Sequence, residues 1–583
     1  MTTLKLIQFS GEIPRLIPRL LADGAAQRAE NVRLDDGGLT PVRKSKRVHT
    51  IGGIPAGDIK TIYKHGEDWL AWSTVVNAAP GSVAEDRLYY TGDGVPKMRV
   101  AGTVYPLAVP FPATALTATL TGTPTGSVVT QRYYAFTYVT DFGEESEPCP
   151  LSNAVNWVEG NTVTLSGFPA IPTGRNITKQ RIYRLQQTLT SGADLFFITE
   201  RTAATTDYVD SIGINDFGEV LPSRDWNAPP DGLQGLISLP NGMMAGFVGK
   251  ALYFCEPYRP HAYPEKYVLT MDYPIVALVA YGSTIIVMTT GTPTIVSGSH
   301  PDSMIQEKTE INLPCINARG VVDLGYAIAY PSHDGLVIGG QGQAPSVVTG
   351  TLMTRQIWQK TNPATFVAGQ YNGRYFASYE YIEANGEVMR GTFIIDLTGS
   401  TPFLLRAATK ADAMFYDVTA GTLNLLVGTE IYEWDAFGEV NEIMTWRSKQ
   451  FILPAPASFG AILIEGQGNV SAEEEAAIEA ERLAALEYNA TIFAMPSIGG
   501  ELNGSAYGVY EVNGDMMKRV APKKFTSVRV VADNEVIATI SDINVTQRLP
   551  PVDKTKTWEV IVNGNAEITQ ITIATTPREL NVI

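Results

Sequence analysis

A strand–turn–strand unit recurs between residues 226 and 446, and this repetition constrains the fold more than any other feature of the sequence. In each unit, two apolar segments flank a tight turn that contains Gly, Asn or Asp. The copies read FVGKALYF from Phe247, AYGSTIIVM from Ala280, SHDGLVIGG from Ser332, YNGRYFASY from Tyr371 and TAGTLNLLV from Thr419. Their turn glycines are 33, 53, 38 and 48 residues apart. Repeats of about 40–50 residues, each worth a small antiparallel sheet, are typical of propeller blades.

A single hairpin is marginally stable in water, so each unit has to bury its faces against its neighbours. The pattern therefore predicts a mainly β fold organised around an irregular β-propeller. An ordinary β-sandwich with several hairpins is the alternative, because the spacing is uneven and the sequence has no Trp-Asp or kelch signature.

Length and composition set further bounds. The chain has 583 residues, enough for three or four domains, and a formal net charge of −16. This charge argues against a basic nucleic-acid-binding surface, which needs clusters of Lys and Arg. The three Cys are too far apart for a disulfide framework or a CxxC metal site, so we expect free, buried thiols. The sequence shows neither a signal-peptide run nor about 18 consecutive apolar residues, so we expect synthesis in a cytoplasm and no membrane anchor.

We predict four regions. Residues 1–111 form an N-terminal arm and a first blade, and residues 112–222 form an inserted immunoglobulin-like or fibronectin-III-like β-sandwich, because their strands lengthen and alternate. Residues 223–450 supply the remaining blades. Residues 451–583 form a β-rich C-terminal region that carries one helix, 471–490, which opens on a SAEE capping box.

Two charged clusters have structural interpretations. The acidic cluster in the inserted region lacks the DxDxDG spacing of calcium loops, so no metal is predicted there; its members are Asp141, Glu144, Glu145 and Glu147. A basic cluster near the N-terminus is interpreted as a solvated strand edge that discourages aggregation; its members are Arg43, Lys44, Lys46, Arg47 and Lys60.

No constellation for catalysis is present. The five His are scattered, and the sequence has no HExxH, GxSxG or GxxxxGK[ST] motif, so we predict no enzyme, no cofactor and no metal. A group of five tyrosines could stack on sugars, but packing between blades is the favoured reading; they are Tyr253, Tyr258, Tyr263, Tyr267 and Tyr273.

The helix 471–490 is strongly acidic, and an exposed helix is its simplest interpretation. If the protein forms a ring, such a helix could instead line the opening, where carboxylates would repel phosphates and let DNA slide. The Gly-rich stretch after it, GGELNGSAYGVY, is our candidate for a constriction loop. The channel or gate candidates are Glu474, Glu475, Glu479, Gly499, Gly500, Asn503 and Tyr507.

Two stretches carry a family resemblance. PRLIPRLLADGAAQRAENVRLDDGGLTPVRK near the start resembles the opening of tail proteins of short-tailed bacteriophages. WRSKQFILPAPASFGAILIEG and QRLPPVDKTKTWEVIVNGNAEITQITIATTPREL near the end resemble the closing segment of the same proteins. These are the tail nozzle or tail tubular protein B family, which is built around a β-propeller. The inserted sandwich and the acidic helix look like additions to it.

The resemblance implies a structural virion protein at the tail tip, made in the host cytoplasm. Six copies would form a ring that continues the DNA channel, retains the genome and lets it pass during ejection, without sequence-specific binding of the DNA. A tail adaptor would lie above it, with fibres or spikes at its side. The alternatives are a receptor-binding tail fibre or adhesin that uses the sandwich domain, and a glycan-degrading tail enzyme.

Overall fold

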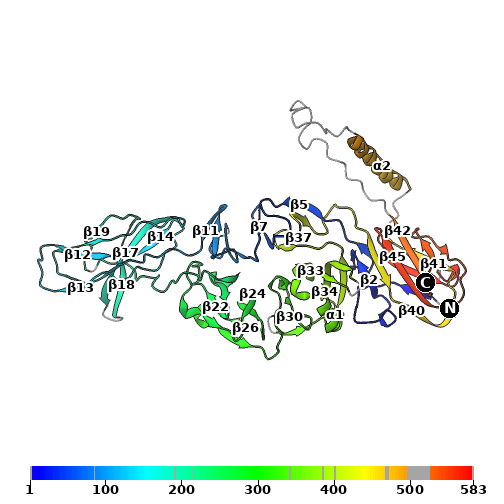
Figure 1. Ribbon diagram of the computed structural model, residues 1–583, viewed down its shortest axis with the longest axis horizontal. Coiled ribbons are helices and arrows are strands. Elements are labelled where there is room, and N and C mark those ends of the chain that lie inside the picture. The colour runs from blue at the N-terminus through cyan, green and yellow to red at the C-terminus, as the bar shows by residue number, and fades with distance from the viewer. Residues whose placement is uncertain are drawn as a thin grey trace. The chain divides into compact units, whose positions relative to one another are not determined.

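The computed structural model describes residues 3–84, 86–188, 192–214, 216–340, 343–383, 386–399, 402–466, 472–494 and 525–580 (Figure 1). The chain divides into two compact units. The first unit comprises Met1–Thr50 and Val347–Ile583, and the second comprises Ile51–Ser346. The described residues form 46 strands and three α-helices, so the fold is mainly β, in many small sheets, as predicted.

In the second unit, most strands follow one another as antiparallel four-stranded sheets, and one hairpin precedes them. The hairpin is β6(Thr61–His65) and β7(Asp68–Trp72). The first such sheet is β8(Asn77–Pro80), β9(Arg87–Thr91), β10(Lys97–Val100) and β11(Thr103–Pro106). The next is β20(Gln234–Ser238), β21(Met244–Val248), β22(Ala251–Phe254) and β23(Leu269–Thr270). After it come β24(Ile275–Tyr281), β25(Thr284–Thr289), β26(Thr294–Ser297) and β27(Ile305–Lys308), and then β28(Val322–Asp323), β29(Ile328–Pro331), β30(Leu336–Gly340) and β31(Gln343–Val347).

Residues 112–222, the inserted region, interrupt this series with two three-stranded sheets and a strand pair. One sheet has the order β12(Thr117–Gly122), β16(Asn161–Ser166), β19(Tyr208–Asp210), and the other β14(Tyr134–Thr140), β17(Ile177–Thr188), β18(Gly192–Thr202). The pair is β13(Thr130–Arg132) and β15(Val155–Trp157). A shared apolar core includes Phe136, Val163 and Ile182, each with no exposed surface.

The first unit joins the two ends of the sequence. Its ten-stranded sheet has the order β32(Val367–Tyr371), β33(Arg374–Ile382), β34(Val388–Asp396), β35(Phe403–Ala407), β2(Ala26–Glu30), β39(Met444–Ser448), β45(Thr555–Gly564), β42(Thr526–Ala532), β43(Glu535–Ile540), with β40(Phe451–Ala457) also on β45. A second sheet has the order β1(Thr3–Leu6), β46(Gln570–Ala574), β41(Ala461–Glu465), β44(Gln547–Arg548). The N-terminal strands therefore lie among strands of the C-terminal region.

The remaining elements of the first unit are short. The strand β5(Lys46–Thr50) completes a sheet with β36(Ala413–Asp417), β37(Thr422–Val427) and β38(Glu430–Glu433), and β3(Val32–Arg33) pairs with β4(Thr40–Pro41). All five residues of β5, among them Lys46 and Arg47 of the basic cluster, are exposed at the end of their sheet. The other three members of that cluster lie outside this strand, and a role against aggregation stays a prediction. The helices are α1(Arg355–Lys360), α2(Ala472–Ala494) and α3(Pro577–Leu580). The predicted helix 471–490 is thus present as α2, four residues longer at its C-terminal end.

The five strand–turn–strand units between residues 226 and 446 are all present as antiparallel hairpins, and the turn between β32 and β33 shows why. Between β32 and β33, Tyr371 pairs with Arg374, so the loop has two residues, Asn372 and Gly373. Both have positive φ, 51° and 70°. A two-residue turn of this hand needs positive φ at both positions, which Asn tolerates and Gly adopts freely.

The predicted segment 1–111 is divided between the units, because residues up to Thr50 belong to the first and those from Ile51 to the second.

The first unit holds its N-terminal arm by apolar packing. Phe9 lies edge-on to Trp446 with ring centroids 5.0 Å apart, and the Trp446 indole nitrogen donates to the Ser10 carbonyl at 3.1 Å. Trp446 has no exposed surface.

Replacing Trp446 with Ala should therefore lower the free energy of unfolding by about 3–5 kcal/mol, because it leaves a large cavity between the arm and β39. Urea denaturation followed by far-ultraviolet circular dichroism measures this loss. Phe437→Ala is the matched control, since Phe437 is 91% exposed, and its effect should stay within about 0.5 kcal/mol. Equal losses in the two variants would contradict the packing role of Trp446.

Candidate functional site

The channel candidates fall into two groups. Glu474, Glu475 and Glu479 lie on α2, whereas Gly499, Gly500, Asn503 and Tyr507 lie outside the described residues. Glu479 accepts two hydrogen bonds from Arg482, one turn further on, at 2.8 and 2.9 Å. Leu483 and Leu486 are 48% and 41% exposed. The described part of α2 therefore presents a partly neutralised acidic surface with solvent-exposed leucines.

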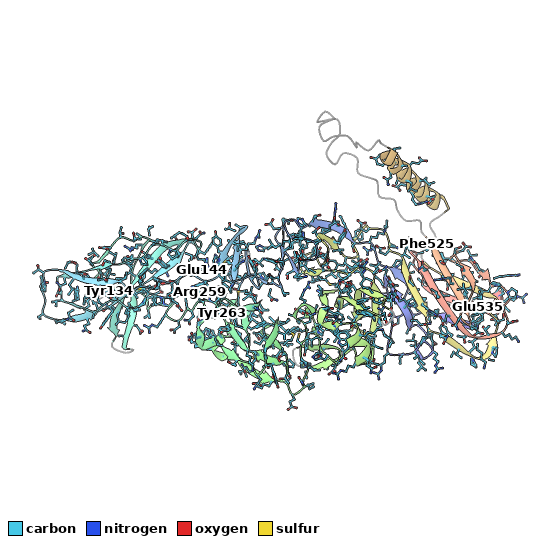
Figure 2. The ribbon with its side chains drawn as sticks, viewed as in Figure 1. Tyr134, Glu144, Arg259, Tyr263, Phe525 and Glu535 are labelled. Carbon is cyan, nitrogen blue, oxygen red and sulfur yellow. The ribbon has the colours of Figure 1, made fainter. Side chains whose placement is uncertain are left out.

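Two members of the acidic cluster in the inserted region, Glu144 (labelled in Figure 2) and Glu145, are buried. The Glu144 carboxylate accepts from Arg175 at 2.6 Å and lies 3.8 Å from the Arg87 guanidinium. Arg175 is 1% exposed and also donates to the carbonyls of Leu107 and Ala108, both at 3.3 Å. Since Arg87 lies on β9, this ion-pair group ties the inserted region to the first four-stranded sheet.

Glu145, the next residue, is bonded in the same way. Its carboxylate accepts from the hydroxyls of Thr137 and Tyr183 at 2.7 and 2.6 Å and from Arg181 at 2.7 Å. The carbonyl of Glu145 accepts from His261 Nε2 at 3.1 Å. His261 belongs to the loop after β22, so Glu145 links the inserted region to a second four-stranded sheet.

Glu147 completes the junction, whereas Asp141 stays outside it. Glu147 accepts from the Asn227 side chain at 2.6 Å, and burial raises the pKa of its carboxyl. Asp141 is exposed and joins none of these contacts. We call Glu144, Glu145, Glu147, Arg175 and His261 the junction cluster. Each of its three carboxylates accepts at least one hydrogen bond, from an arginine, a hydroxyl or an amide donor.

His261 is the titratable group of this junction that matters near neutral pH. It is 2% exposed, and its ring lies edge-on to Trp226 at 5.8 Å. Burial lowers the pKa of His261 to about 4, and the positive charges of Arg175 and Arg259 act in the same direction, against Glu144. The folded protein therefore holds this imidazole neutral.

The free energy of unfolding of the second unit should fall at acidic pH, because the unfolded chain protonates His261 more readily than the folded protein does. The unfolded chain binds a proton at this residue below pH 6.5 and the folded chain only below about 4, so the stabilisation is complete above pH 6.5 and is lost as the pH falls toward 4. By pH 5 the loss should reach about 2 kcal/mol. Urea unfolding between pH 7.5 and 5 measures it, with His261→Gln expected to have a shallower pH dependence. The difference between the proteins at pH 7.5 serves as the control for lost packing, and parallel pH profiles would contradict the role of His261.

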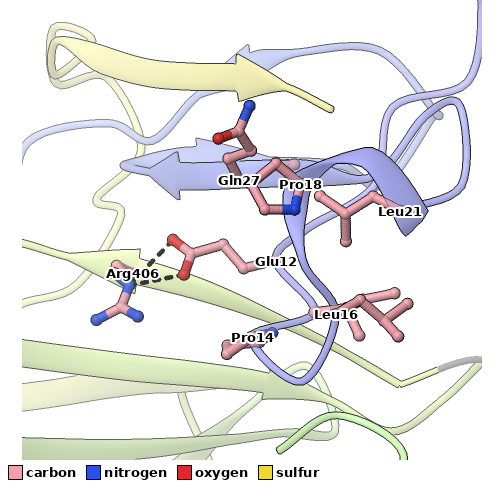
Figure 3. A pocket seen from close by; sticks show the side chains of 9 residues that line it. Glu12, Pro14, Leu16, Pro18, Leu21, Gln27 and Arg406 are labelled. Carbon is pink, nitrogen blue, oxygen red and sulfur yellow. Dashed lines mark hydrogen bonds and ion pairs between the residues drawn. The ribbon is translucent and has the colours of Figure 1, made fainter. Parts of the chain in front are cut away.

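A pocket of about 250 Å³ lies under the N-terminal arm in the first unit (Figure 3). It is lined by Glu12, Ile13, Pro14, Leu16, Pro18, Leu21, Ala26, Gln27 and Arg406. Glu12 is 3% exposed, and both its carboxylate oxygens accept from Arg406 Nε, at 2.9 and 3.0 Å. One of these oxygens also accepts from the Ala29 amide at 3.0 Å.

Arg406 is held in turn by aromatic side chains. Its guanidinium lies 5.1 Å from the centre of the Phe393 ring, which stacks on Tyr379 at 3.8 Å. Burial alone would lower the pKa of Arg406, but the Glu12 carboxylate outweighs it and raises the pKa. Both Glu12 oxygens are therefore engaged, and burial raises the pKa of this carboxyl. The Glu12–Arg406 ion pair connects the N-terminal arm to β35. The backbones of Glu12 and Leu404 also exchange hydrogen bonds there.

Breaking this pair should destabilise the first unit strongly. Arg406→Met leaves a buried carboxylate without its partner, which should cost about 3–5 kcal/mol of unfolding free energy. Lys410→Met is the matched control, because Lys410 pairs with Glu380 at the surface and such pairs contribute at most about 1 kcal/mol. Chemical denaturation of both variants tests this difference. A loss of less than 1 kcal/mol for Arg406→Met would show that the pair does not hold the arm.

Other groups that sequence reasoning weighed are structural. All three cysteines are free and buried, as expected, and burial raises the pKa of Cys149 to about 11 and those of Cys255 and Cys315 to about 12. In the described part of the chain, no three His, Cys, Asp or Glu side chains come together in a way that could hold a metal ion. None of the described helices is long and apolar enough to span a membrane.

The five tyrosines do not form a platform. Tyr263 and Tyr267 are buried, and Tyr253 is half-buried. Tyr258 and Tyr273 are exposed, and their rings pack against Gly242 and Gly291, where a β-carbon would clash. The five tyrosines therefore take part in packing, which was the favoured interpretation.

Two of the buried ion pairs show why sequence reasoning did not predict them. The Glu12–Arg406 pair joins residues at opposite ends of the first unit, and nothing near either residue points to the other. The Glu144–Arg175 pair had one usable signal, an acidic cluster inside an otherwise apolar region, but the sequence does not show which arginines neutralise it.

Comparisons with known proteins add no identification. No protein-family model matches the chain, and no curated protein matches it. One solved structure it aligns with is the extracellular domain of a one-component system from B. thetaiotaomicron, at 8% identity and a TM-score of 0.21, over 93% of this chain and 81% of that one. A TM-score this low supports no argument about fold or function.

Proposed function

We propose that this protein is a structural component of a short-tailed bacteriophage virion, a nozzle at the tail tip. Six copies would form a ring that continues the DNA channel, retains the genome and lets it pass during ejection. An adaptor would bind above, and fibres or spikes at the side. In this proposal the protein is not an enzyme and needs no cofactor.

One observation carries the proposal. The two stretches that resemble the nozzle family lie at opposite ends of the sequence, yet they fold together. In the ten-stranded sheet, β2 from the first stretch pairs with β39, and β39 pairs with β45 from the last. In the smaller sheet, β46 pairs with β41, so segments of the closing stretch also meet each other. A motif split in this way is expected if both parts belong to one ancestral module.

The proposed architecture is an irregular β-propeller that carries an inserted immunoglobulin-like or fibronectin-III-like sandwich. Its support is the series of antiparallel four-stranded sheets, together with β32 to β35, which are consecutive neighbours in the ten-stranded sheet. The early strand β5 completes the sheet β36–β37–β38 to four strands, the size of a propeller blade. The inserted region has the two packed sheets that a sandwich needs.

The surface charge suits a conduit. Each chain carries a formal net charge of −16, so a ring of copies would repel the DNA backbone and let it move. The junction cluster fixes the inserted region to neighbouring sheets through buried ion pairs, which suits a part that has to keep its orientation in a large assembly.

Electron microscopy of the purified protein, and of virions from the same source, tests this function. The expected result is a six-fold ring with a central channel that matches density on the tail axis. A stable monomer or trimer that is absent from the tail axis would contradict it. In that case the adhesin hypothesis would replace the nozzle hypothesis. Binding of the inserted region to host-cell surfaces would then be the measurement to make.

A further inference from the structure

Two strands of the first unit end their sheets with an exposed edge. The strand β5 is the last member of the sheet β36–β37–β38–β5, and β43 is the last of the ten-stranded sheet. Alternate N–H and C=O groups of an edge strand point away from its only neighbour and can pair with another strand. Neither edge is paired with a further strand among the described residues.

The two edges carry opposite charge. In β5 all five residues are exposed, including Lys46 and Arg47, and the Arg47 side chain stays 62% exposed although it bonds to Glu430. At β43 the exposed acidic residues are Glu535, labelled in Figure 2, and Asp533 just before it. The strand β43 contains neither Lys nor Pro, two residue types that protect many edge strands from pairing.

Charge restricts which edges can meet. Two β5 edges would repel each other, and so would two β43 edges, whereas β5 against β43 brings opposite charges together. A contact between two different surfaces of the same chain is head-to-tail, and head-to-tail contacts close into rings when the rotation allows. Opposite charges on the two edges therefore select the kind of contact from which a ring is built.

We propose that β5 of one copy pairs with β43 of the next, so that a sheet of each copy continues into its neighbour. This inference rests on the proposed ring and names the contact that closes it. Pairing would also cover Val48 and Val536, which are 40% and 52% exposed. Each strand has one bulge residue, Val48 in β5 and Ile537 in β43, so the ladder is short and charge gives the contact its specificity.

Charge reversal tests the pairing. The acidic-edge variant carries Lys46→Glu and Arg47→Glu, and the basic-edge variant carries Glu535→Lys and Val536→Lys. All four residues are exposed, so both variants should fold. Each variant alone should lose at least tenfold in ring population, measured by native mass spectrometry and light scattering at the concentration where the wild-type chain assembles.

An equal mixture of the two variants should assemble again, because every contact in an alternating ring then joins opposite charges. The mass spectrum should show the two chains in equal number. The matched control is Lys250→Glu with Lys266→Glu, two exposed lysines of the second unit, and it should assemble like the wild type.

The outcomes separate the two proposals. Rings that persist in both separate variants, or a mixture that fails to assemble, would overturn the β5–β43 contact and leave the nozzle function standing. A wild-type chain that stays monomeric and is absent from the tail axis would overturn both. Assembly of the mixture alone, with strict alternation, supports the contact and also shows that the variants are folded.

Discussion

The first unit depends on pairing between strands from opposite ends of the chain. The strand β2 lies between β35 and β39, with Ala29 opposite Trp446, and β39 continues the sheet to β45. The whole second unit, Ile51–Ser346, lies in the sequence between these partners. Closing so large a loop costs entropy before the sheet contacts repay it. The first unit therefore completes its core only after β45 has been made.

This arrangement explains why the N-terminal arm is held by several kinds of contact at once. Backbone pairing at Glu12 and Leu404, the buried Glu12–Arg406 pair and the packing of Phe9 on Trp446 all act on one short segment. A buried ion pair contributes little net stability, because desolvation of the charges offsets their attraction. It does penalise any register in which one charge lacks its partner. The pair thus selects the correct docking of the arm rather than supplying most of its energy.

The inserted region uses the same principle. Within it, the buried Asp210 accepts from Tyr134 at 2.7 Å and from Arg184 at 3.0 Å. At its boundary, the junction cluster joins it to neighbouring sheets. An apolar boundary would tolerate sliding, whereas bonds from Arg175 to a carboxylate and two carbonyls require one orientation. The buried polar groups at this boundary therefore lower the free energy of unfolding somewhat, but they define the orientation of the inserted region against its neighbouring sheets.

Local features of the fold were predictable, because local chemistry decides them. Asn372-Gly373 specifies its turn by backbone preference alone, and the run of Ala, Glu and Leu after residue 471 specifies α2. Pairing between distant segments was not predictable in this way, since nothing near Glu12 points to Arg406. The acidic cluster at Glu144 showed that charge had to be neutralised but not by which residue. From the sequence, either a bound cation or an arginine could have neutralised Glu144. The fold shows that the partner is Arg175.

Because the chain is acidic overall, the basic stretch from Arg43 to Arg47 differs in charge from the rest of the protein. On a protein with a formal net charge of −16, an exposed strand that carries Lys46 and Arg47 attracts an acidic part of a second copy. The buried carboxylates do not take part, because internal arginines already neutralise Glu12 and Glu144. Under the proposed assembly, the acidic residues left at the surface are those that would repel DNA or attract β5. Under the proposed assembly, one charge imbalance therefore serves two purposes: it keeps the channel from binding DNA, and it leaves β5 as an edge that favours acidic neighbours.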